Sequence, residues 1–202
     1  MKIFDEIKPS GHLEITKVYS DGRQELVLDE KNMIVSGFGV GLSYLFSLSG
    51  SQKITDYQLD RFQIGVCSTQ TVSSTVYKLD YPLSSAAHYG VESKLVVVSA
   101  TQIQNGINVT NQVFAFIPFK NVTRLSNNSV RYTLILDERA ANNLASYGYP
   151  GGTDASIREI GLFMKNPRGD AQTASILSAY KQFSPLKKSS DFSLIFRWTI
   201  SF

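Results

Sequence analysis

The sequence is poor in the side chains that most often carry chemistry. Its 202 residues include one cysteine, Cys67, and two histidines, His12 and His88. A single cysteine excludes an internal disulfide and a thiolate-based metal site, which need several ligands at set spacing. A catalytic role for Cys67 would require a neighbouring base, which two scattered histidines offer little prospect of supplying. We therefore expect no catalytic residue, no cofactor and no metal ion.

Neither positive nor negative charge predominates in the sequence. The chain has 20 Lys and Arg against 17 Asp and Glu, a formal net charge of +3. Lys187 and Lys188 form the single adjacent basic pair, so the sequence has no basic stripe that would neutralise many phosphates. We expect no sequence-specific nucleic-acid binding, and we interpret the lysine pair as a solvated surface feature before the last strand.

Long apolar runs are missing as well. Acidic residues at positions 5 and 6 interrupt the start of the chain, where a signal peptide would need a continuous apolar region. No later stretch reaches the length of a membrane-spanning helix. We expect a protein that is made in a cytoplasm and does not associate with a membrane.

What the sequence does contain is β-strand pattern. Residues 13–28 predict a β-hairpin, because Asp21-Gly22 lies between two apolar, β-favouring runs and glycine accepts the positive φ of a tight turn. Further strands are expected from alternation or β-favouring composition, and the segments concerned are 61–66, 94–103, 109–119, 130–136, 157–164 and 174–183. Short helices are expected around 42–46 and at 137–144, the second with Asp137 as N-cap.

The last strand has the plainest pattern. Large apolar side chains alternate from Phe192 to the final residue, and their positions are Phe192, Leu194, Phe196, Trp198, Ile200 and Phe202. Side chains at alternate positions of a strand share one face, so this strand should line the core. We predict an all-β fold: one antiparallel β-sandwich domain over residues 1–202, with one or two short helices and long loop insertions.

Charged neighbours on the strands offer little catalytic potential. Asp60-Arg61 and Arg158-Glu159 are the most suggestive pairs. Successive side chains on a strand point to opposite faces, so neither pair should act together on one substrate without a bulge. Cross-strand salt bridges are the favoured interpretation of both.

Two other patterns fall short of known binding motifs. The glycines at positions 37, 39 and 41 lack the Lys-Ser/Thr of a phosphate-binding loop, so they favour close helix packing or a bend. Asp56, Asp60 and Asp154 could supply oxygen ligands for calcium, although none lies in an alternating acidic loop. The sequence therefore gives no support for a metal site at these acids.

Tyrosines in two predicted loops are the candidate partner-binding residues. The loops cover residues 68–90 and 145–154, and the candidate interface tyrosines are Tyr77, Tyr81, Tyr89, Tyr147 and Tyr149. Exposed tyrosines combine flat apolar area with a hydrogen-bonding tip, which suits protein interfaces and sugar-binding platforms alike. The alternative is that two or three of them cover the core of their own subunit.

Distinctive segments lie at both ends of the chain: residues 8–15 and 32–37 near the start, and residues 157–163, residues 183–192 and the closing strand through Trp198 near the end. In these segments the chain resembles structural proteins of tailed-bacteriophage virions. The resemblance covers about a third of the chain. It implies a non-catalytic particle subunit with no catalytic residues to transfer.

These observations together favour a non-enzymatic virion component that assembles through protein–protein contacts. We expect it in the tail, neck or collar, as a homo-oligomer or as part of a symmetric assembly with other virion subunits. The alternatives are a capsid decoration protein and a carbohydrate-binding receptor module of a tail fibre. An enzyme is the least favoured class.

Overall fold

The fold is described from a computed structural model of the chain. The structure describes residues 8–47, 53–66, 73–76, 78–83, 89, 94–98, 102–104, 107–109, 112–149, 151–166 and 174–202. Cys67, Tyr77 and His88 therefore lie outside the described residues, as does much of the predicted 68–90 loop.

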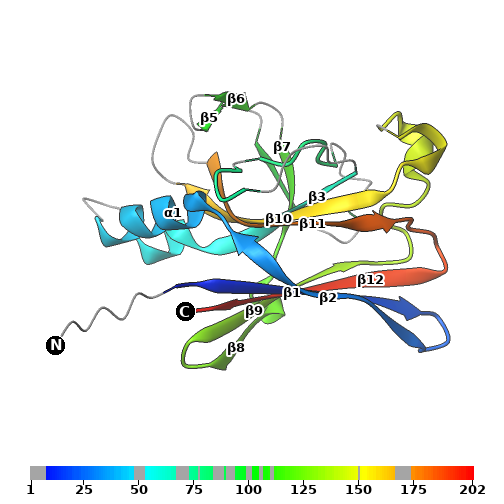
Figure 1. Cartoon of the computed structure of the whole chain (residues 1–202), viewed down its shortest axis with the longest axis horizontal. Coiled ribbons are helices and arrows are strands. Elements are labelled where there is room, and N and C mark those ends of the chain that lie inside the picture. Colours follow the sequence, from blue (N-terminus) through cyan, green and yellow to red (C-terminus); the bar gives the residue numbers. More distant parts are fainter. Residues whose placement is uncertain are drawn as a thin grey trace.

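The chain forms a ten-stranded antiparallel sheet that folds over itself into two layers (Figure 1). The strands of one half are, in order, β2 (Gln24–Ile34), β1 (Ser10–Tyr19), β12 (Phe192–Ser201), β9 (Ser129–Leu136) and β8 (Val122–Ser126). The strands of the other half are β4 (Leu95–Val98), β7 (Gln112–Phe116), β3 (Leu59–Gly65), β10 (Ile157–Asn166) and β11 (Ala174–Leu186). A separate hairpin pairs β5 (Gln102–Gln104) with β6 (Ile107–Val109). The all-β prediction is confirmed.

The two halves join through one short pairing. Strand β11 pairs with the end of β2 at two positions, Ala179 with Ile34 and Tyr180 with Met33. Elsewhere the halves face each other across the apolar core, as in a sandwich. The rings of Phe62 on β3 and Trp198 on β12 lie 6.1 Å apart, centroid to centroid, across this core.

Strand β12 is the centre of its layer and has the predicted alternation. Phe192, Leu194, Phe196, Trp198 and Ile200 are buried, and the residues between them are partly exposed. Phe202 departs from the prediction, since it lies beyond the end of the strand and is 45% exposed. Its ring packs instead against Phe38, with a centroid separation of 6.0 Å.

The predicted N-terminal hairpin is confirmed and is longer than expected. Strands β1 and β2 pair from Gly11 opposite Asn32 to Val18 opposite Gln24. Gly22 in the turn has a φ of 85°, which glycine adopts without the steric cost of a Cβ atom. The Asp-Gly signal therefore located the turn correctly.

Helix α1 (Ser36–Phe46) contains the three glycines within its length rather than before its start. A Cβ atom at Gly37 would collide with the backbone carbonyl oxygen of Leu177 on β11, and one at Gly41 would meet the Met164 side chain on β10. These glycines allow the helix to lie close against the sheet, as the packing interpretation expected.

The predicted helix at 137–144 is wrong. Residues 138–143 form turns, and a short 3₁₀ helix, η4 (Leu144–Tyr147), follows them. Ala141 and Asn143 have φ values of 53° and 52°, a left-handed conformation that interrupts a right-handed helix. Asp137 accepts a hydrogen bond from the backbone N–H of Arg139 at 2.9 Å, which stabilises a turn. The described residues also form the 3₁₀ helices η1 (Ile54–Tyr57), η3 (Phe119–Asn121) and η5 (Gly152–Asp154).

Candidate functional site

The candidate interface tyrosines differ in their burial. Tyr147 in η4 is 55% exposed and Tyr81 is 45% exposed, so both present a ring at the surface. Tyr149 is partly buried against the core. Tyr89 is fully buried and its hydroxyl accepts a hydrogen bond from the backbone N–H of Ile64 at 3.3 Å. Burial raises the pKa of the Tyr89 hydroxyl.

Tyr89 is therefore a core residue, and its prediction as an interface anchor is wrong. Its ring fills part of the space between the two sheet halves, where it contributes apolar area to folding and none to a partner. Tyr81, Tyr147 and Tyr149 remain candidates. They lie on two separate stretches of the chain.

The Arg158-Glu159 pair does not form the cross-strand salt bridge that was expected for Glu159. The Glu159 side chain is fully buried, and its Oε1 accepts hydrogen bonds from the backbone N–H groups of Asp80 and Tyr81 at 2.9 and 3.2 Å. Its Oε2 accepts one from the hydroxyl of Tyr180 at 2.7 Å. Burial, the largest effect, raises the pKa of the Glu159 carboxyl. The carboxylate anchors the 80–81 segment to β10.

Asp60 and Arg61 agree with the prediction in part. They form a buried ion pair with each other, with 2.7 Å between Arg61 Nε and Asp60 Oδ1. The register of β3 against β10 shifts at this point, since Arg61 pairs with Phe163 and Leu59 with Met164. This irregularity is a β-bulge, and it allows the neighbouring Asp60 and Arg61 side chains to contact each other. Lys165 Nζ on β10 lies 3.4 Å from the second carboxylate oxygen of Asp60 on β3, and this contact is the expected cross-strand salt bridge.

An apolar groove of about 410 Å³ is lined by residues of α1 and by the C-terminal Phe202. Figure 1 shows α1 and the C-terminus at the same end of the molecule. Its walls come from α1, η1, η3, β8 and β9, and Phe202 closes one side. Apart from Gln58 and Asp60, the lining side chains are apolar or aromatic. We call this feature the α1 groove.

Several lining side chains of the α1 groove reach into solvent. Phe119 is 89% exposed, Ile54 is 70% exposed and Phe202 is 45% exposed. Phe46, at the end of α1, is 85% exposed. Large apolar groups that gather around one depression are typical of a surface that another molecule covers.

The α1 groove was missed in the sequence. Phe119 was assigned to the end of a strand, and Ile54 lay in a segment without a clear pattern. Pro118 before Phe119 was the available signal, because proline cannot continue the hydrogen-bonded ladder of a central strand. The strand β7 ends at Phe116, two residues before Pro118.

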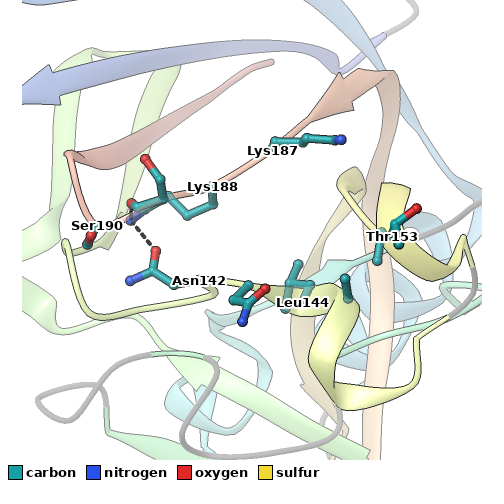
Figure 2. Close-up of a pocket in the computed structure, with 10 residues that line it drawn as sticks. Asn142, Leu144, Thr153, Lys187, Lys188 and Ser190 are labelled. Carbon is teal, nitrogen blue, oxygen red and sulfur yellow. Dashed lines mark hydrogen bonds between the residues drawn. The ribbon is translucent and has the colours of Figure 1, made fainter.

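A second cavity lies beside the other end of β12, and Figure 2 shows its lining. It has a volume of about 500 Å³ and lies between the 142–145 turn, η5 and residues 187–190. Lys188 lies in its wall, and its Nζ donates hydrogen bonds to Asn142 Oδ1 at 3.1 Å and to the carbonyl oxygen of Ser189 at 2.6 Å. We call this cavity the Lys188 pocket.

Lys188 was predicted to be a solvated surface residue, which is wrong. Its relative exposure is 6%. Burial lowers the pKa of its amine to about 8, while the nearby carboxylates of Asp137, Glu138 and Asp191 partly oppose that shift. Lys187 does fit the prediction, because it is exposed and forms a surface ion pair with Asp154 at 2.9 Å.

Within the described residues, no three His, Cys, Asp or Glu side chains are grouped closely enough to hold a metal ion. His12 lies on the exposed face of the β1–β2 hairpin, with its Nε2 2.9 Å from Asp29 Oδ1. No helix in the described part of the chain is long and apolar enough to span a membrane. Comparison with models of known families, with curated proteins and with solved structures finds no match to this chain.

Proposed function

We propose that this protein is a non-enzymatic structural subunit that assembles with further copies of itself through the α1 groove. The observation that carries the proposal is the exposure of Phe119, Ile54 and Phe202 around one apolar depression. In water, each of these side chains exposes apolar area that a neighbouring subunit would cover. Burying one such group stabilises a contact by about 1.5–3 kcal/mol before the entropy of association is subtracted.

The use of the polar groups supports a non-catalytic assignment. Glu159 accepts hydrogen bonds from the backbone of Asp80 and Tyr81 and from Tyr180, and Asp60 and Arg61 neutralise each other inside the sheet. Catalysis needs polar groups that converge on a space where a substrate can react. These two charged clusters stabilise the fold instead.

We place this subunit in the virion of a tailed bacteriophage, in the tail, neck or collar, on the strength of the resemblance at the two ends of the sequence. The residues that carry it belong largely to β1, β10, β11 and β12, which build the core. The assembly surface proposed here lies elsewhere, on α1, η1 and η3. A capsid decoration protein would use the same kind of contact.

The experiment compares the molar mass of the wild-type chain and of two variants by size-exclusion chromatography with light scattering. Phe119→Ser should weaken self-association by about 2 kcal/mol or more, which is about thirtyfold in the association constant. Because Phe119 is 89% exposed, the variant should fold like the wild type.

The matched control is Leu26→Ser. Leu26 is 59% exposed on the β1–β2 hairpin, and it does not line the groove. This variant should associate like the wild type. An unchanged association constant for Phe119→Ser, or an equal loss for both variants, would contradict the assignment of the groove.

A further inference from the structure

The lining of the Lys188 pocket contains positively charged side chains and no negatively charged one. The ten lining residues include Lys187 and Lys188 and no carboxylate. Asp154 pairs with Lys187 outside the lining, and Asp137, Glu138 and Asp191 lie near enough to Lys188 to favour its protonated form. The two lysines are therefore the charged groups of the lining itself, and the carboxylates that offset their charge lie around it.

Three polar side chains of the lining are exposed, so their hydrogen-bonding groups are accessible to a ligand. They are the amide of Asn143 and the hydroxyls of Thr153 and Ser190. They come from three different elements, so they surround the space instead of following one strand. Leu144, Ala145 and Ala155 add an apolar floor.

The Lys188 amine has one hydrogen left for a ligand. Two of its three N–H bonds are directed to Asn142 and Ser189, and its Nζ lies 5.2 Å from the centroid of the Phe192 ring. In Figure 2, the Lys188 side chain extends toward Asn142, while Lys187 extends to the side of Thr153. The third N–H of Lys188 is therefore the donor that an anion in the pocket would use.

The backbone beside the pocket is strained. Ala141 and Asn143 both have positive φ values, which non-glycine residues rarely adopt. Such strain concentrates where a loop is held in place for binding. Here it holds the Asn143 amide at the wall of the pocket.

We infer that the Lys188 pocket binds an acidic sugar, with Lys188 holding the anionic group and Asn143, Thr153 and Ser190 binding hydroxyls. Sugar binding requires several amide and hydroxyl groups around an apolar surface, and an acid on the sugar requires a cation. The cavity volume of about 500 Å³ lies in the range of small-molecule sites. This inference is independent of the assembly through the α1 groove.

The test is isothermal titration calorimetry of the purified chain at pH 7 with glucuronate, glucose 6-phosphate and glucose. We expect saturable binding of at least one of the two acidic sugars, about tenfold tighter or more than that of neutral glucose. The ratio of the affinities for glucuronate and for glucose 6-phosphate then identifies whether the site prefers a carboxylate or a phosphate.

Neighbouring lysines supply the matched control. Lys188→Met keeps the apolar stem and removes the charge, so it should weaken binding of the preferred acidic sugar about tenfold or more, whereas Lys187→Met should change it about threefold or less. Lys188→Arg, which keeps the charge, should retain part of the affinity if Lys188→Met folds poorly. Absent binding of both acidic sugars, equal binding of glucose, or full affinity in a folded Lys188→Met variant would overturn the inference.

Discussion

At the scale of single residues, Glu159 shows how a buried carboxylate can order a surface segment. It accepts hydrogen bonds from two backbone N–H groups and from Tyr180 while it is shielded from water. Burial raises the pKa of this carboxyl above its ordinary value of 4.5. A carboxyl with a raised pKa in the folded state is protonated there more readily than in the unfolded chain.

The sign of the resulting pH dependence follows from this shift. Because the pKa of Glu159 is higher in the folded state, protonation of this carboxyl stabilises the folded state relative to the unfolded chain. This stabilisation is complete below pH 4.5, the ordinary pKa that applies to the unfolded chain. It is lost as the pH rises through the folded-state pKa. We predict that Glu159→Gln, which resembles the protonated form, removes this loss in urea unfolding measured from pH 4 to pH 7.

A suitable control is Glu30→Gln, because Glu30 is exposed and pairs with Lys181 at the surface. It should keep the wild-type dependence on pH. If Glu159→Gln and the wild type lose the same stability between pH 4 and pH 7, titration of Glu159 is not the cause of the loss, which would contradict this prediction.

Trp198 provides a second test at this scale. The indole is fully buried at the centre of β12, and its Nε1 has no hydrogen-bond partner within the described residues. We predict that Trp198→Ala lowers the free energy of unfolding by about 3–5 kcal/mol, measured by urea denaturation. Trp198→Phe should cost less than about 1.5 kcal/mol, since it keeps most of the ring and removes no hydrogen bond. Equal losses for the two variants would contradict the packing described here.

At the scale of elements, α1 offers a comparison between two glycines of one helix. Gly37 lies against the carbonyl oxygen of Leu177, whereas Gly39 is exposed with no atom near the position of a Cβ. We predict that Gly37→Ala destabilises the protein by about 1–3 kcal/mol because it pushes the helix off β11. Gly39→Ala should stabilise it by about 0.5–1 kcal/mol through helix propensity. Thermal unfolding measures both, and a stable Gly37→Ala variant would show that the close approach is not required.

The elements also show what the sequence could predict. The hairpin and the β9, β10, β11 and β12 strands were predicted because alternation and turn residues are local signals. The turns at 138–143 were mistaken for a helix, since their composition favours helix while two left-handed residues determine the path. The Asp60 bulge depends on the register against β10, which adjacent residues do not encode.

At the scale of the whole molecule, the two surface sites depend on contacts between distant segments. The α1 groove brings together α1, η1, η3 and Phe202, and the Lys188 pocket brings together residues 142–145, η5 and 187–190. Neither set is contiguous in the chain, so alternation along one strand gives no sign of it. The partner-binding tyrosines were predicted from loop composition alone, which explains why Tyr89 was misplaced in the interface.

The α1 groove and the Lys188 pocket lie beside opposite ends of β12, since Phe202 follows the strand and residues 187–190 precede it. Contacts at the α1 groove are apolar and should persist at high salt, where hydrophobic association is not screened. Binding at the Lys188 pocket depends on charge, so it should weaken with salt and as the pH rises above about 8. Separate responses to salt therefore distinguish the two surfaces.

The structure of the assembled oligomer, determined by electron cryomicroscopy, tests the central claim most directly. The account predicts that a neighbouring copy covers Phe119, Ile54 and Phe202 and leaves the charged clusters of Glu159 and Asp60 inside each subunit. An assembly in which the α1 groove faces open solvent, with the contacts between copies made elsewhere, would contradict it.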